Sequence, residues 1–256
     1  MRLSIIQHNI VWEKKHENLR SLGEVISSVY GNTDIVVLPE MFSTGFTMNP
    51  ADISEAPYAE TYDWMLDISV KGNVGLCGSY IVKQDRSFFN RWVFVSPERK
   101  SWHYDKRHLF SITNEDKNYT RGNNRVVFSF RGVRICPNIC YDLRFPVWSR
   151  NRQDYDLLIN SANWPESRKD VWITLLKARA IENQCYVAGV NRTGWDGEGI
   201  KYSGNSMIIG PKGNIITEID DNKEELVTAE ISLSVLNDFR DKFPVHKDAD
   251  NFTISI

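Results

Sequence analysis

The sequence predicts a layered α/β sandwich, and three observations support this fold class. About a dozen β segments alternate with four helices along the chain, which is typical of layered α/β folds. Several β segments follow one another across turn signals as hairpins, so an all-parallel sheet is not expected. The 256 residues are 41% hydrophobic and contain no repeat, low-complexity segment or Pro/Gly-rich linker, so a single domain with a sizeable core is predicted.

The first half of the chain is predicted to hold two helices among β segments. Apolar residues recur at helical spacing from Leu19 to Val29, and Gly31 then ends that helix. A second helix is predicted over 57–70. Runs of apolar and β-branched residues predict strands at 3–10, 35–39, 74–82, 91–96 and 101–106.

The second half is predicted to hold the longest helix, at 166–184, and a short helix after the last strand. Pro137 lies inside one predicted strand, where it cannot donate to a ladder, so we expect an edge, a bulge or an unpaired position there. The predicted strands of this half are 126–130, 133–140, 156–162, 185–190, 206–210, 214–219 and 226–231.

Composition and charge favour a small-molecule ligand. A formal net charge of −2 without blocks of like charge gives no reason to expect nucleic acid or a membrane surface as partner. The N-terminus turns polar too early for a signal peptide, and no apolar run reaches the roughly 18 to 20 residues that span a bilayer. The four cysteines are dispersed through a long chain, so reduced thiols in the cytoplasm are expected.

Three ionisable residues each lie at the polar end of a predicted strand: Glu40, Lys106 and Cys140. Strand ends hold side chains rigidly beside clefts. A thiol needs a base or a nearby cation to become a nucleophile, a carboxylate can carry its proton to a leaving amine, and an ammonium can stabilise an oxyanion. The three residue types together therefore suggest amide cleavage, although any one of them at a strand end is more often structural.

Other hypotheses stay open at this point. A cysteine–histidine hydrolase would pair the thiol with His103 or His108. A metal site would use Cys136, Cys140 and His103, but C-x3-C without a second pair is a poor zinc signature. A binding protein that has lost its activity would have no reason to retain these reactive groups together.

Four stretches of the chain, in this order, resemble the nitrilase superfamily of carbon–nitrogen hydrolases. They are LPEMFSTGF (38–46), YDKRHLF (104–110), ICYDLRFP (139–146) and SANWP (161–165). The resemblance covers residues 3 to about 231. YDKRHLF, CYDLRFPVWSRN and the ending KFPVHKDAD look most like the bacterial omega-amidases, which act on 2-oxo acid amides.

This resemblance implies a role for each reactive residue. Glu40 would be the general base and acid, and Cys140 the nucleophile that forms a thioester as ammonia leaves. Lys106, with the amide of Tyr141, would stabilise the oxyanion. Glu115, seven residues before Gly122, would orient the lysine or the substrate; its alternative is a solvated loop acid.

The resemblance also implies a fold and an assembly. The fold would be an α-β-β-α sandwich of two mixed sheets flanked by helices, with a core at about 3–231 and a C-terminal helix and tail at 232–256. No metal or organic cofactor is required. Family members assemble as homodimers or larger homo-oligomers, so contacts through 146–152 and 168–184 are expected.

The implied substrate is a small 2-oxo dicarboxylic acid monoamide, with a nitrile, an N-carbamoyl amine or a longer aliphatic amide as alternatives. An arginine would suit its carboxylate. Arg144 is the first candidate, with Arg168 and Arg192 behind it, although a pairing of Arg144 with its neighbour Asp142 is the stronger expectation. The residues expected to line the pocket are Phe42, Tyr119, Tyr141, Trp164 and the backbone of Asn163.

Overall fold

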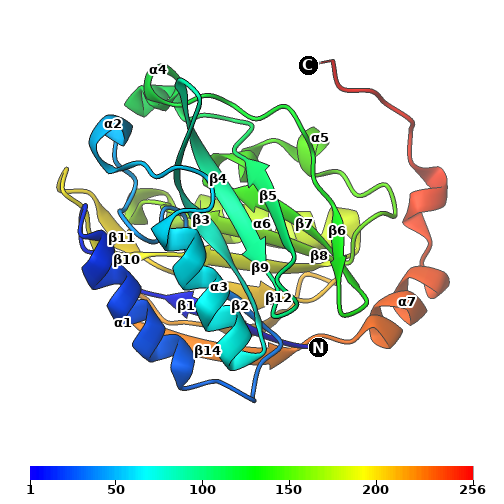
Figure 1. Cartoon of the computed structure of the whole chain (residues 1–256). Helices are drawn as coiled ribbons and strands as arrows, with labels where there is room; N and C mark the ends of the chain where they lie inside the picture. The colour runs from blue at the N-terminus through cyan, green and yellow to red at the C-terminus, as the bar shows by residue number, and fades with distance from the viewer. Residues whose placement is uncertain (256) are drawn as a thin grey trace.

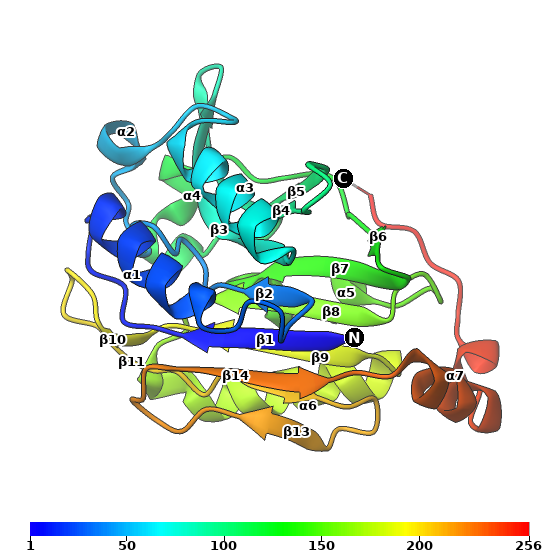
Figure 2. The same ribbon diagram turned by 60° about the horizontal axis from the view of Figure 1, so that its bottom comes forward.

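The computed structural model describes residues 1–255, which form two six-stranded sheets packed face to face (Figures 1 and 2). In spatial order, the first sheet consists of β14 (Glu225–Glu230), β1 (Arg2–Gln7), β2 (Ile35–Val37), β3 (Gly75–Gln84), β4 (Ser87–Val95) and β5 (Ser101–Asp105). The second consists of β13 (Ile215–Glu218), β12 (Met207–Ile209), β9 (Tyr186–Asn191), β8 (Leu157–Ala162), β7 (Val133–Ile139) and β6 (Phe128–Phe130). Each sheet has a parallel centre and antiparallel edges, so the predicted mixed sheets are confirmed.

Helices cover the outer face of each sheet. The helices α1 (Lys15–Ser27) and α3 (Glu60–Gly72) lie against the first sheet, and α6 (Lys169–Asn183) lies against the second (Figure 2). The shorter helices are α2 (Pro50–Ile53), α4 (Glu115–Asn118), α5 (Pro146–Ser149) and α7 (Leu233–Lys242), with 3-10 turns η1 (Ser111–Thr113), η2 (Cys140–Arg144), η3 (Glu166–Arg168) and η4 (Val245–Asp248). The predicted α-β-β-α order of layers is therefore confirmed.

The alternation of side chains along each strand explains these layers. In β2, Ile35 and Val37 point into the core between the two sheets, whereas Val36 packs with the residues of α1 and α3. In β8, Ile159 faces the other sheet and Leu158 faces α6. Strands buried on both faces read as continuous apolar runs, which is why IVV and LLI gave a clear strand signal.

Pro137 lies where β7 has a neighbour on one side only. Its partner across the parallel ladder is Ile159 of β8, while pairing with β6 ends at Ile135. Of the expected alternatives, the edge position is thus confirmed. The last part of β7, just before Cys140, therefore pairs with β8 but not with β6.

Some local structure differs from the expectation. The helix predicted at 166–184 begins as η3 and becomes α-helical only at Lys169. A hairpin of β10 (Thr193–Trp195) and β11 (Lys201–Ser203) was not predicted, because its strands are only three residues long. No helix among residues 1–255 combines the length and the apolar character that crossing a membrane requires.

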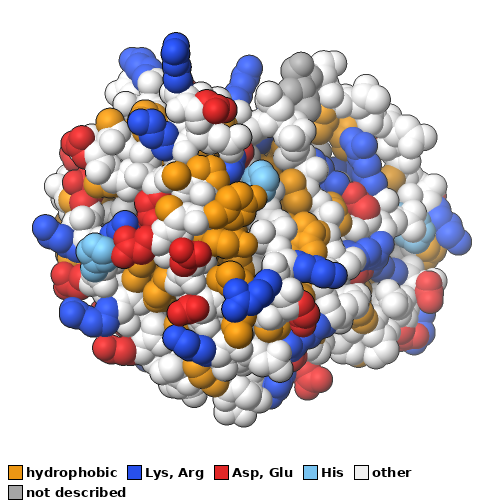
Figure 3. Space-filling model, viewed as in Figure 1, with side chains coloured by type: hydrophobic (Ala, Val, Ile, Leu, Met, Phe, Trp, Pro, Cys, Tyr) orange, Lys and Arg blue, Asp and Glu red, His pale blue; other side chains and the backbone are white. Residues whose placement is uncertain are grey.

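Hydrophobic side chains reach the surface beside α3 and the β4–β5 hairpin, in the middle of the face that Figure 3 shows. Tyr58, Tyr62 and Trp102 line a shallow depression there, together with His103. Side chains alternate between the two faces of β5, so His103 lies on the opposite face from the buried Tyr104. This placement separates His103 from the interior between the sheets.

Candidate active site

Four residues that build the site come from the ends of four strands. Glu40 follows β2, Lys106 follows β5, Cys140 follows β7 and Asn163 follows β8. Glu40 is 0% exposed and Lys106 is 1% exposed, so both ionisable groups are removed from water. Such burial requires that the charges be paired.

Lys106 lies between two carboxylates. Its Nζ donates to Oε1 of Glu40 at 2.9 Å and to both carboxylate oxygens of Glu115 at 3.0 Å. Glu115 is fully buried in the first turn of α4 and also accepts the backbone N–H of Phe110 at 2.6 Å. Glu115 is thus a member of the buried cluster, and the alternative of a solvated loop acid is wrong.

Two asparagines orient the carboxylate of Glu40. Asn90 donates its side-chain N–H to Oε1 at 2.7 Å, and the backbone N–H of Asn163 donates to Oε2 at 2.8 Å. The side chain of Asn163 also donates to the carbonyl of Glu40 at 2.7 Å, so both its backbone and its amide participate. Asn90 was missed from the sequence, where its signal is one amide inside the apolar strand SFFNRWVFV.

Cys140 sits on a strained turn. Its φ of +43° is in the left-handed region that residues with a Cβ rarely adopt, and it is the first residue of η2. The thiol is half-buried, lines the same pocket as Lys106 and contacts the carbonyl of Asn163 at 3.7 Å. Asn163 therefore contacts both the thiol and Glu40.

The three ionisable groups shift one another's proton affinity. Burial and the charge of Glu40 raise the pKa of the Cys140 thiol well above its usual value, with Lys106 opposing the shift. Burial opposes the charge on Lys106, but Glu115 and Glu40 outweigh it and raise the pKa of the ammonium. Burial, opposed by Lys106 and assisted by Glu40, raises the pKa of Glu115. The resting site therefore holds a neutral thiol beside a charged lysine.

Asp142 fixes the turn that carries the thiol. Its carboxylate accepts the backbone N–H groups of Ile139 and His108 and the hydroxyl of Tyr104, at 3.0, 2.9 and 2.7 Å. The expected pairing of Arg144 with Asp142 is wrong, because these three donors occupy the buried carboxylate. Arg144 instead places its guanidinium over the ring of Trp164, at 5.0 Å.

Neither histidine hypothesis is supported by the structure. The Nδ1 of His108 lies 2.8 Å from Asp142, and its ring stacks on Phe145. Within residues 1–255, no hydrogen bond joins a histidine to Cys140. No three His, Cys, Asp or Glu side chains of the described chain group as metal ligands, so Cys136, Cys140 and His103 do not form the postulated site.

The thiol opens into a small cavity of about 50 Å³. Of the residues expected to line it, Tyr141, Asn163 and Trp164 do so. The prediction for Phe42 is wrong: this ring is 0% exposed and packs in the core under α1 and α3. The other lining residues are Phe46, Lys106, Phe110, Thr113, Cys140, Arg144, Pro165, Arg168, Ile200 and Tyr202.

Two further candidates for the pocket lie elsewhere. Tyr119 is buried and donates its hydroxyl to the carbonyl of Thr47 at 2.7 Å. Arg192 is also buried, and its guanidinium donates to backbone carbonyls, including that of Ile10 at 2.9 Å. Both side chains support loops rather than line the cavity.

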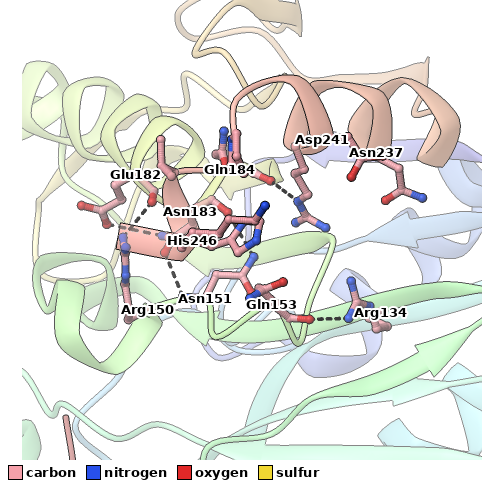
Figure 4. A pocket seen from close by; sticks show the side chains of 14 residues that line it. Arg134, Arg150, Asn151, Gln153, Glu182, Asn183, Gln184, Asn237, Asp241 and His246 are labelled. Atoms are coloured by element: carbon pink, nitrogen blue, oxygen red, sulfur yellow. Dashed lines mark hydrogen bonds between the residues drawn. The ribbon is translucent and has the colours of Figure 1, made fainter. Parts of the chain in front are cut away.

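A larger cavity, of about 480 Å³, lies near the start of β7, beneath α7 (Figure 4). Its charged side chains are largely occupied by the protein itself. Arg134 and Arg240 both bind Asp156, and Arg150 donates to the carbonyl of Glu182. The smaller cavity, which contains the thiol and the lysine, is therefore the candidate active site.

The sandwich and the buried acid–amine cluster beside a thiol together indicate a hydrolase. A model of the carbon-nitrogen hydrolase family matches residues 2–241, and the chain belongs to this family of hydrolases of carbon–nitrogen bonds.

Individual relatives match over nearly the full length. The chain is 43% identical to "Omega-amidase YafV" of Yersinia enterocolitica, covering 99% of this chain and 98% of the relative. It is 33% identical to the "2-oxoglutaramate amidase" of Bacillus subtilis strain 168, with 96% of each chain covered. The crystal structure of XC1258 from Xanthomonas campestris, a CN-hydrolase superfamily protein with an arsenic adduct in its active site, superposes with a TM-score of 0.97. It is 37% identical and covers 100% of this chain and 99% of its own. The resemblance predicted from four short motifs is therefore confirmed.

Proposed function

We propose that this protein hydrolyses the terminal amide of a small 2-oxo dicarboxylic acid monoamide, such as 2-oxoglutaramate or 2-oxosuccinamate, to the acid and ammonia. The observation that carries the proposal is Lys106, held between Glu40 and Glu115 in the pocket that Cys140 lines. The names of two relatives, an omega-amidase and a 2-oxoglutaramate amidase, support this choice of substrate.

In the first half-reaction, the sulfur of Cys140 attacks the amide carbon while Glu40 takes the thiol proton. The proton transfer must accompany the attack, because the raised pKa keeps the thiol neutral beforehand. The ammonium of Lys106 and the N–H of Tyr141 stabilise the oxyanion. Glu40 then gives the proton to the nitrogen, the carbon–nitrogen bond breaks, and ammonia leaves a thioester on Cys140.

In the second half-reaction, Glu40 takes a proton from a water molecule as the water oxygen attacks the thioester carbon. The carbon–sulfur bond breaks, the proton returns to the sulfur, and the carboxylic acid leaves. The hydrogen bonds from Asn90 and Asn163 hold the Glu40 carboxylate in one orientation for both transfers. Glu115 acts as a positioning residue, because it contacts the ammonium of Lys106.

The pocket supports a short substrate with an acid at its far end. The cavity is small, about 50 Å³, which favours a short acyl chain over a long one. The guanidinium of Arg144 stacks on Trp164 and keeps its edge available for a carboxylate. A nitrile, an N-carbamoyl amine or a longer aliphatic amide would use the same thiol but would not need this arginine.

Ammonia release from 2-oxoglutaramate, from an aliphatic nitrile and from an N-carbamoyl amino acid tests the proposal. We expect turnover of the first to exceed that of the other two by at least about tenfold, the effect of roughly one charged hydrogen bond. Cys140→Ala is the control for contaminating activity. No turnover of 2-oxoglutaramate beside clear turnover of a competitor would overturn the choice of substrate.

A cytoplasmic location and a homodimer are further parts of this proposal. All four cysteines are free thiols, as a reducing compartment requires. Val147 on α5 and Ile181 on α6 are each 55% exposed, which supports a contact through the two predicted segments.

A further inference from the structure

The cavity beside Cys140 has an unusual charge distribution. It is lined by three cationic side chains, Lys106, Arg144 and Arg168, and by no Asp or Glu. The charge of Lys106 is balanced by the carboxylates of Glu40 and Glu115, with which it forms ion pairs. The charges of the two arginines are not balanced by any acid that lines the cavity, so the cavity is cationic.

The two arginines differ from other arginines of this chain that are withdrawn from solvent. Arg91, Arg125 and Arg240 each form a close pair with an aspartate, at 2.7, 2.5 and 2.8 Å. Within residues 1–255, the guanidinium groups of Arg144 and Arg168 form neither an ion pair nor a hydrogen bond. A half-buried cation without a partner has lost hydration and has gained little in exchange.

Arg168 is held in place by contacts that leave its donors free. The indole N–H of Trp164 donates to the backbone carbonyl of Arg168 at 2.9 Å. The guanidinium lies 5.5 Å from the centre of the Phe110 ring. Contact with an aromatic face uses the plane of the guanidinium, while its N–H groups project from the edge. The side chain is therefore preorganised to donate to a ligand.

Arg168 and Arg144 approach the cavity from different walls. Arg144 lies over Trp164, and Arg168 lies over Phe110, which packs edge to face with Tyr141 at 4.9 Å. A bidentate pair between a carboxylate and one guanidinium uses two N–H donors. Two guanidinium groups together therefore have donors to spare for another acceptor. A 2-oxo acid offers a further acceptor, because its keto oxygen is adjacent to the carboxylate.

We propose that Arg168 is a second anchor for the acid end of the substrate, acting with Arg144 to select monoamides that carry a 2-oxo carboxylate. This inference rests on the proposed function and adds the residue that sets its specificity. A neutral amide of the same length would leave both guanidinium groups desolvated without a partner, so it would bind poorly.

The test compares Arg168→Gln with the wild type on 2-oxoglutaramate and on pentanamide, a neutral amide. We expect kcat/KM for 2-oxoglutaramate to fall about 10- to 100-fold, mainly through KM, and that for pentanamide to change less than about threefold. Arg168→Lys should recover only part of the loss, because an ammonium cannot bind in a bidentate manner. The rate of Cys140 alkylation by iodoacetamide, a neutral probe, is a second readout that a distorted site would change.

Arg152→Gln is the matched control, since Arg152 also lies over an aromatic ring, that of Phe252, but outside the cavity. Equal losses on both substrates, or no loss on either, would overturn the role of Arg168 while leaving the proposed function intact. A wild type that hydrolyses pentanamide as well as 2-oxoglutaramate would overturn the proposed function and the inference together.

Discussion

Replacing Glu40 by Gln changes one charge in the site and almost no volume. The carboxylate accepts three strong hydrogen bonds, from Lys106, Asn90 and the backbone N–H of Asn163. A glutamine has only one oxygen, so its NH₂ must face a donor whichever way it is turned. If the amide oxygen of the glutamine keeps the hydrogen bonds from Lys106 and Asn90, the backbone N–H of Asn163 loses its acceptor.

The structure allows both consequences of this change to be estimated. One buried donor without an acceptor costs about 1–3 kcal/mol of folding stability, and for a chain of this size each kcal/mol lowers Tm by about 2–4 °C. Loss of a general acid–base group typically costs about 10²- to 10⁴-fold in rate. Because Glu40 is proposed to act in both half-reactions, we expect kcat to fall at least about 10³-fold.

The assay is ammonia release under saturating 2-oxoglutaramate, with thermal unfolding measured on the same preparation. Glu55→Gln is the matched control. The carboxylate of Glu55 is also largely buried, accepts hydrogen bonds from Thr61 and lies away from the cavity. This control should lose stability and retain activity. A Glu40→Gln enzyme that keeps more than about a tenth of the wild-type kcat would refute the role of Glu40 as the proton carrier.

Three other predictions follow from the same geometry. The charge of Glu40 raises the pKa of Cys140, so Glu40→Gln should lower that pKa and, at a fixed pH below it, speed alkylation of the thiol by iodoacetamide; a slower rate at every pH would contradict this sign. His108→Asn should retain near-full kcat with a loss of about 1 kcal/mol in unfolding free energy, whereas a loss above a hundredfold in kcat would restore the cysteine–histidine hypothesis. Val147→Asp with Ile181→Asp should convert the predicted dimer to a monomer in light scattering, and a dimer that persists would refute a contact through these two side chains.

The sequence was most informative where local chemistry decides the structure. Doubly buried strands such as β2 read as strands because every residue is apolar. Glu40, Lys106 and Cys140 were predicted because each is an ionisable group at the polar end of a predicted strand, in a stretch that resembles the nitrilase superfamily. These features need no knowledge of distant contacts.

The sequence was least informative about which side of a loop faces the cavity. Phe42 and Phe46 both lie in LPEMFSTGF, yet Phe42 packs in the core and Phe46 lines the pocket. Arg144 and Asp142 are close in sequence, but the carboxylate of Asp142 turns back to the N–H of Ile139. Such choices depend on packing between segments that are far apart in the chain.

Long-range polar contacts were also beyond sequence reasoning. Asn90 reaches Glu40 across 50 residues, and Asn163 reaches it across 123. An isolated amide in an apolar strand marks a buried partner without identifying it. The assembled sheets supply that partner, because β4 lies two strands from β2 in the same sheet and the packing of the two sheets brings the end of β8 to the end of β2.

The proposed mechanism requires that Cys140 become acylated at each turnover. Enzyme quenched in acid during hydrolysis of 2-oxoglutaramate, digested and weighed by mass spectrometry, tests this claim most directly. We expect the acyl group on the peptide that contains Cys140 and on no peptide that contains Cys77, Cys136 or Cys185. An acyl group on another cysteine, or undiminished turnover by Cys140→Ala, would contradict the account.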